Sequence, residues 1–141
     1  MSSVNTQFSI AVHIMTGLAV SDNYQITSGA LSESVNASPS FVRRVLAKLS
    51  KADLVRTTSG KSGSCTLVRK PSKINLLEIY DAVEAPKAFA IHEYPETKGC
   101  RVSCNIKPSL QSVLDRTTKA VESTLKDTSL ADVVEGLHKK R

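Results

Sequence analysis

The sequence has few aromatic residues, three Phe, three Tyr and no Trp among 141 residues, so a core built from it must be mainly aliphatic. No apolar run approaches the roughly 18–20 residues that a membrane-spanning helix needs, and we expect no membrane association. The first residues, Met-Ser-Ser-Val-Asn-Thr-Gln, lack the basic and long apolar regions of a secretion signal. These absences favour a cytoplasmic protein.

Enzyme signatures are also missing. The sequence has no Gly-rich phosphate loop, no Gly-x-Ser-x-Gly elbow and no His-Glu-x-x-His pair. Cysteine is scarce: only Cys65, Cys100 and Cys104 are present, and no Cys-x-x-Cys spacing suggests a metal site. We therefore predict that the protein is not an enzyme and needs no metal or other cofactor.

Positive charge is in excess. The chain carries 19 Lys and Arg against 13 Asp and Glu, giving a formal net charge of +6 and a pI of about 9.4. This balance modestly favours a polyanionic partner. The length suits one domain with an appendage.

The most informative stretch runs from residue 38 to residue 55. Ser38 suits a helix N-cap, and Pro39 suits the first helical position because its missing N–H has no partner there. One side of the predicted helix is apolar, with the spacing of a buried stripe, at Val42, Val45, Leu46 and Leu49. The other side is polar and basic, with Ser40, Arg43, Arg44, Ala47, Lys48 and Lys51.

The flanking sequence completes a known motif. A short helix capped by Thr27 or Ser28 ends at Val35, and Asn36-Ala37 forms a tight turn before Ser38. Two strand-like runs, 54–58 and 64–69, follow with a Gly-containing basic turn at 59–63 between them. This order predicts a winged helix-turn-helix: a mainly α fold with a small β-hairpin wing (α+β).

The second half of the chain is organised differently. Residues 86–104 show no period, and Asn105 is predicted to cap a long amphipathic helix from Ile106 to Leu125. An exposed apolar stripe on such a helix is most simply buried against the same helix of a second subunit. We therefore divide the chain into a DNA-binding domain (1–85), a sensor or linker loop (86–104), and a dimerisation helix with a C-terminal helix (105–141).

The motif assigns candidate DNA contacts. Arg side chains read guanine through paired donors, and Ser hydroxyls bond a base or a phosphate. The candidates are Ser38, Ser40, Arg43, Arg44, Lys48 and Lys61. Lys51 and Arg56 also suit phosphate contacts. A dimer would place one such helix in each of two major grooves, so the expected partner is palindromic double-stranded DNA.

Several segments resemble a family of bacterial winged-helix regulators that includes IscR, NsrR and CymR, and its YwnA-like branch. These segments are 31–55, 60–67, 75–84, 89–95, 100–106 and 129–133. The resemblance implies a homodimeric transcription regulator, usually a repressor, with Ser40 and Arg43 facing base edges and the long helix as dimer interface. It also shows two departures. Ser59 stands where the family's wing carries Arg, and only Cys100 and Cys104 stand where iron–sulfur members have three Cys.

The cysteines allow more than one hypothesis. Cys100 and Cys104 lie near a helix start, beside Lys98 and Arg101, where positive potential favours a reactive thiolate. We therefore predict a thiol switch there, with Cys65 as a possible disulfide partner or a buried side chain. Two alternatives stay open. One is a metal- or iron–sulfur-containing regulator using Cys100, Cys104 and His92; the other is a basic module that binds RNA or protein.

Overall fold

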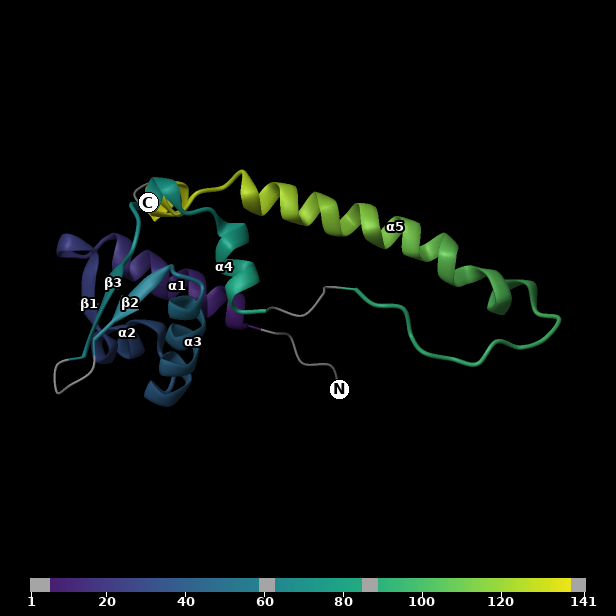
Figure 1. The fold of residues 1–141 in the computed structure, drawn as a ribbon, viewed down its shortest axis with the longest axis horizontal. Helices are drawn as coiled ribbons and strands as arrows, with labels where there is room; N and C mark the ends of the chain where they lie inside the picture. Colours follow the sequence, from purple (N-terminus) through teal and green to yellow (C-terminus); the bar gives the residue numbers. More distant parts are fainter. Residues whose placement is uncertain (1–5, 59–62, 85–88, 138–141) are drawn as a thin grey trace. The chain divides into compact units, whose positions relative to one another are not determined.

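The computed structural model describes residues 6–58, 63–84 and 89–137, and Figure 1 shows its ribbon. It forms two compact units: unit 1 is Met1–Ala85 with Leu125–Arg141, and unit 2 is Pro86–Thr124. The elements in chain order are α1 (Gln7–Ala19), η1 (Asp22–Tyr24), β1 (Gln25–Thr27), α2 (Ser28–Val35), α3 (Pro39–Lys51), β2 (Val55–Thr57), β3 (Ser64–Leu67), η2 (Pro71–Lys73), α4 (Leu76–Ala82), α5 (Arg101–Lys126) and α6 (Leu130–Leu137).

The helix-turn-helix is formed by α2 and α3, which pack against each other and against α1. Thr27 caps α2 by accepting a hydrogen bond from the amide of Ala30 at 3.1 Å. Asn36 ends α2 in the left-handed conformation, with φ of 60°, a region that Asn tolerates better than most residues. The left-handed Asn36 turns the chain two residues before Ser38, which caps α3. The predicted helix, turn and second helix are confirmed.

The wing is part of a three-stranded antiparallel sheet with the order β1-β3-β2. In the register of its strands, Thr57 of β2 faces Cys65 of β3, and Ile26 of β1 faces Cys65 from the other side. The predicted hairpin is confirmed in β2 and β3, and the short extended run at Gln25 becomes the third strand. The turn at 59–62 lies outside the described residues.

The core of unit 1 is aliphatic, as the scarcity of aromatics predicts. The stripe of α3 at Val42, Val45, Leu46 and Leu49 is at most 3% exposed. These side chains join buried residues of α1, α4 and the strands in a single cluster. Burying one face of α3 leaves its opposite, basic face to solvent.

The end of the chain also belongs to this core. Leu130, the first residue of α6, is fully buried, and α6 packs on α1. The amide of Leu130 donates to the carbonyl of Ile74 at 2.8 Å, and the amide of Leu76 donates to Thr128 at 2.9 Å. Leu125–Arg141 belongs to the same compact unit as Met1–Ala85, so the contacts divide the chain differently from the sequence-based grouping of 105–141.

Unit 2 holds most of α5, which starts earlier than its sequence suggests. We expected Asn105 to cap a helix beginning at Ile106, but α5 begins at Arg101. The side chain of Asn105 instead donates to the carbonyl of Arg101 at 2.6 Å, inside the helix. Cys104 is therefore helical, and Pro108 lies within the helix rather than in its first turn. None of the described helices is long and apolar enough to cross a membrane.

Candidate nucleic-acid interface and thiol site

The N-terminal end of α3 presents the candidate DNA contacts. The Ser38 hydroxyl accepts a hydrogen bond from the amide of Phe41 at 3.3 Å and so fixes where the helix begins. Ser38, Ser40, Arg43 and Arg44 are all exposed. The hydroxyls of Ser38 and Ser40 lie 3.4 Å apart. Two hydroxyls and two guanidinium groups therefore face solvent over the first two turns of one helix.

Arg44 is held in place by a neighbour on the same helix. Its guanidinium carbon lies 5.2 Å from the centre of the Phe41 ring, within range of a cation–π contact. Such stacking limits the freedom of a long side chain before it meets a partner. Arg43, by contrast, lies beside the wing, where it lines a cleft with residues of β2 and β3.

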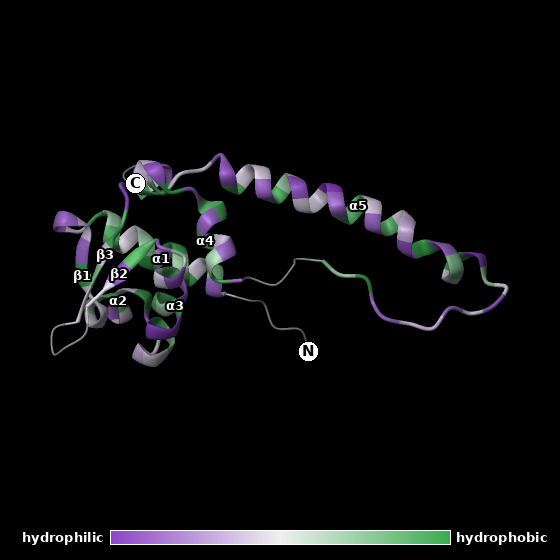
Figure 2. Ribbon diagram, viewed as in Figure 1, coloured by the Kyte–Doolittle hydropathy of each residue, from purple (hydrophilic) through white to green (hydrophobic). Residues whose placement is uncertain are grey.

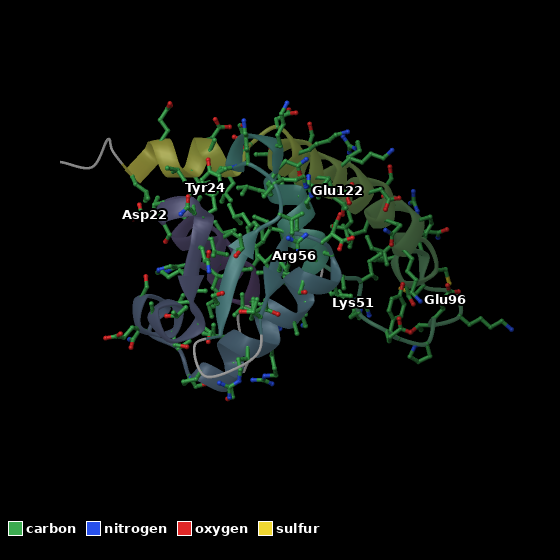
Figure 3. The ribbon with its side chains drawn as sticks, turned by 60° about the vertical axis from the view of Figure 1, so that its left-hand side comes forward. Asp22, Tyr24, Lys51, Arg56, Glu96 and Glu122 are labelled. Carbon is green, nitrogen blue, oxygen red and sulfur yellow. The ribbon has the colours of Figure 1, made fainter. Side chains whose placement is uncertain are left out.

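The candidate lysines differ in position. The ammonium of Lys48 donates to the side-chain oxygen of Gln7 at 2.8 Å, so in the single chain Lys48 ties α3 to α1. Lys51, labelled with Arg56 in Figure 3, ends α3 about 18 Å along the helix axis from its first residue. Arg56 is exposed on β2. Lys61 lies outside the described residues.

The thiol region forms a small network at the start of α5. The amide of Ser103 donates to the sulfur of Cys100 at 3.3 Å, so Cys100 acts as the cap of the helix. The Cys104 thiol donates to the carbonyl of Thr97 at 3.5 Å, and the amide of Thr97 donates to the Ser103 hydroxyl at 2.8 Å. Cys100 is half-buried and Cys104 is exposed.

Tyr94 fastens the preceding segment to the same turn. Its hydroxyl donates to the carbonyl of Ser103 at 2.6 Å. The ring stacks on His92, with centroids 4.8 Å apart, and the ammonium of Lys107 lies 4.7 Å from its centre. Sequence reasoning missed Ser103 and Tyr94, because neither lies in a periodic pattern and their contacts form only once the segment folds back.

Cys65 has a different environment from the other two cysteines. It is 2% exposed in the middle of β3, and burial raises the pKa of its thiol. A raised pKa leaves little thiolate, the form that reacts with oxidants. All three thiols are free in the described part of the chain. The structure therefore favours Cys100 and Cys104 over Cys65 as reactive groups.

A metal site would need more ligands than this region supplies. Within residues 6–58, 63–84 and 89–137, no group of three or more His, Cys, Asp and Glu side chains is placed to hold an ion. The candidate set of Cys100, Cys104 and His92 is thus not assembled in a single chain. His92 stacks on Tyr94, and the Cys104 thiol bonds a backbone carbonyl.

Comparison with known proteins identifies the family. The sequence profile of the Rrf2 family, described as iron-dependent transcriptional regulators, matches residues 4–136. The chain belongs to the Rrf2 family. A relative in the same functional class is YwnA of Bacillus subtilis, named as a candidate HTH-type transcriptional regulator. It is 33% identical over 135 residues, which cover 95% of this chain and 98% of YwnA.

Solved structures share the fold of this chain. A crystal structure named as that of a candidate DNA-binding protein is 30% identical, with a TM-score of 0.71, over 90% of this chain and 97% of that one. CymR, the global cysteine regulator of B. subtilis, has the same fold: its TM-score is 0.69 at 21% identity, over 96% of this chain and 98% of CymR. The resemblance inferred from the sequence and the winged-helix fold are both confirmed.

Family membership also settles the broad class of activity. The Rrf2 family and the YwnA relative are transcriptional regulators, which confirms the expectation that this chain is not an enzyme. The protein is a DNA-binding transcriptional regulator of the Rrf2 family.

Proposed function

We propose that the protein is a homodimeric repressor that binds palindromic DNA through α3 and is controlled by thiol oxidation at Cys100 and Cys104. The observation that carries the DNA-binding part is the exposed start of α3, where Ser40, Arg43 and Arg44 surround a capped helix end. Helix N-termini of this kind enter the major groove in helix-turn-helix proteins. Repression follows the resemblance to the family's repressors.

Dimerisation is supported by α5. This helix has 26 residues, about 39 Å in length, and none of its side chains is buried in the single chain. Figure 2 shows apolar residues recurring along it between hydrophilic ones. Five side chains on one side of α5 are 37–67% exposed: Val102, Ile106, Leu110, Val113 and Val121. A second α5 is the partner that would cover them most simply.

The polar gap in this stripe is compatible with burial. Thr117 falls between Val113 and Val121 on the same side of the helix. Its hydroxyl donates to the carbonyl of Val113 at 2.9 Å. Because its donor is already bonded within the helix, covering Thr117 by a second chain would leave no unpaired hydroxyl proton.

The proposed switch follows from helix geometry. Residues four apart on a helix have Cβ atoms about 5–6 Å apart, whereas a disulfide needs about 3.5–4.5 Å. A bond between Cys100 and Cys104 would therefore distort the first turn of α5. The disulfide would also break the hydrogen bond from the Ser103 amide to the Cys100 sulfur. It would displace the Ser103 carbonyl, to which the Tyr94 hydroxyl donates.

The sequence offers α5 a second place to start. Pro108 has no N–H, so it cannot bond the carbonyl of Cys104, and the helical ladder is interrupted just after the cysteines. Asn105 is a good N-cap for a helix that begins at Ile106. Oxidation would thus favour the shorter helix, change the dimer contact near Val102 and Ile106, and alter the spacing of the two α3 helices.

The chemistry of the switch balances with a peroxide as oxidant. Two thiols give up two electrons, an S–S bond forms and the O–O bond breaks. Both thiol protons and both peroxide protons end in two water molecules. A dithiol reverses the reaction by exchange.

The test is a gel shift with the DNA upstream of the protein's own coding sequence, in reducing buffer and after peroxide. We expect specific binding to weaken about tenfold on oxidation and to return with dithiothreitol. Cys100→Ser and Cys104→Ser should each abolish the response, whereas Cys65→Ala should keep it. A normal response in Cys100→Ser would refute the switch, and no preference for any palindromic duplex would refute the DNA-binding proposal.

The family description favours a second candidate, a regulator that carries iron or an iron–sulfur cluster. Because the described residues of one chain do not bring three such ligands together, we infer that the site would draw residues from two chains. Anaerobic purification followed by visible absorbance and elemental analysis separates the candidates. We expect a colourless protein without iron; a coloured, iron-containing dimer that loses its colour in Cys100→Ser would favour the second candidate.

A further inference from the structure

A cleft lies in unit 1 between α3 and the strand residues that flank the turn of the wing. It has a volume of about 220 Å³. Its polar side chains come from α2, α3, β2 with its adjoining residue, and β3: Ser28, Arg43, Thr57, Thr58 and Ser64. Leu46 and Cys65, both at most 3% exposed, form an apolar floor. None of the described residues that line the cleft is acidic.

Hydrogen bonds hold the walls in place. The Thr58 hydroxyl accepts from the amide of Ser64 at 3.1 Å and lies 3.0 Å from the Ser64 hydroxyl. The side chain of Gln25 donates to the same Ser64 hydroxyl at 3.1 Å. The amide of Ser28 donates to the carbonyl of Gly63 at 3.4 Å, which joins α2 to the wing. The cleft is therefore formed before any partner arrives.

The charge and chemistry of the cleft suit an anion. Arg43 supplies a permanent positive charge with five N–H donors. The hydroxyls of Ser28 and Thr57, which also line the cleft, add hydrogen-bond donors. Burial raises the pKa of the Cys65 thiol beneath them, so the floor stays neutral. A phosphate oxygen is the anion that a DNA-binding protein meets most often.

The geometry of a winged helix places such a phosphate here. The major and minor grooves of a duplex are separated by a sugar–phosphate strand. A protein that inserts α3 into the major groove and lays its hairpin along the neighbouring minor groove must pass that strand between the two elements. The cleft occupies this position, because α3 forms one wall and β2 and β3 form the other.

We propose that this cleft seats one backbone phosphate of the DNA, bonded by Thr57, Ser28 and part of the Arg43 guanidinium. The inference rests on the proposed DNA-binding function and adds two contact residues to it. Phosphate contacts position a protein without reading sequence. Thr57 and Ser28 should therefore contribute to affinity on every duplex, while the remaining donors of Arg43 stay available to base edges.

The test uses a duplex that the wild-type protein enriches from a random DNA pool. Thr57→Val keeps the shape and strand preference of the side chain but removes the hydroxyl. We expect it to weaken binding about fivefold to tenfold, equally on the enriched duplex and on a random one. Ser28→Ala should behave in the same way. The matched control is Thr66→Val, which lies on the opposite face of the sheet and should bind as wild type does.

Single methylphosphonates, which remove one phosphate charge each, then locate the contact. At one position per half-site, we expect the methylphosphonate to weaken binding by the wild type but not to weaken binding by Thr57→Val any further. Such non-additive losses of affinity indicate a direct contact between Thr57 and that phosphate. If the losses of affinity are additive at every phosphate position, or if Thr57→Val binds as wild type does, the proposed phosphate seat is refuted. DNA binding itself would remain. A wild type that enriches no duplex would overturn both.

Discussion

Glu78 links two parts of unit 1 through one carboxylate. Its carboxylate oxygens accept hydrogen bonds from both Nη atoms of Arg69, at 2.7 and 3.3 Å, and from the amide of Asn75 at 3.1 Å. In return Asn75 accepts from the amide of Glu78 at 3.0 Å, which completes a capping box at the start of α4. Arg69 follows β3, so this carboxylate ties the end of the wing strand to the next helix.

This arrangement makes stability depend on pH. Partial burial raises the pKa of Glu78, but the hydrogen bonds from Arg69 and Asn75 and the charge of Arg69 outweigh it and lower the pKa below its usual value. A lowered pKa stabilises the fold above the unfolded value of about 4.3, and this contribution is lost as pH falls through the folded value. Because both side chains are more than a third exposed, the pair contributes about 0.5–1 kcal/mol.

Glu78→Gln should be less stable than wild type by this amount at pH 7, and the difference should shrink as pH falls below about 4. Urea unfolding at pH 7 and at acid pH measures it. Asp132→Asn serves as a control, because the Asp132 carboxylate accepts from the amide of Ser129 at the start of α6 and forms no ion pair among the described residues. A difference that stays constant with pH would show that the charge of Glu78 does not matter.

The exposure of a side chain can be predicted from the sequence where it depends only on neighbouring residues of the same helix. Ser38, Arg43 and Arg44 follow from one capped, amphipathic helix, and all three are exposed as expected. Lys48 was assigned to DNA on the same pattern, but its partner Gln7 lies 41 residues away, which no helical period reveals. The capping role of Cys100 was hidden because sulfur is an uncommon cap.

Among the secondary-structure elements, the sequence predicts most helices and strands of unit 1 because their signals are short-range. The start of α5 is the exception. Asn105 and Pro108 both mark a helix start, but the network of Cys100, Ser103 and Thr97 extends the helix to Arg101. The place of α6 was also unpredictable, because its burial depends on residues 74–76 and on α1.

The buried start of α6 gives a prediction about the wing domain. Leu130→Ala removes a fully buried side chain and should destabilise unit 1 by about 2–5 kcal/mol. Leu137→Ala, in the same helix at 51% exposure, is the matched control and should cost less than about 0.5 kcal/mol. Thermal unfolding followed by circular dichroism compares the two. Equal midpoints would mean that α6 does not support the core.

At the scale of the whole molecule, the described chain divides into a unit with its own core and a unit whose long helix buries no side chain. Unit 1 has a continuous cluster of buried side chains, whereas α5 buries none. A stable interface covers about 800 Å² on each partner. A helix about 39 Å long with an apolar stripe can supply a large share of that area. The proposed dimer would therefore cover the apolar surface that one folded chain leaves exposed.

Two neighbouring positions on α5 can test this assembly, because only one of them lies on the apolar stripe. Val113, 43% exposed, belongs to the stripe, whereas Ser112 is rotated about 100° away from it. Val113→Glu would place a charge in the proposed interface, where an unpaired charge is costly to bury. We expect sedimentation to show a monomer for Val113→Glu and a dimer for Ser112→Glu. The monomer should also lose its preference for two half-sites over one, since both α3 helices must be joined to read a palindrome. If both variants sediment as dimers, the stripe on α5 is not the interface.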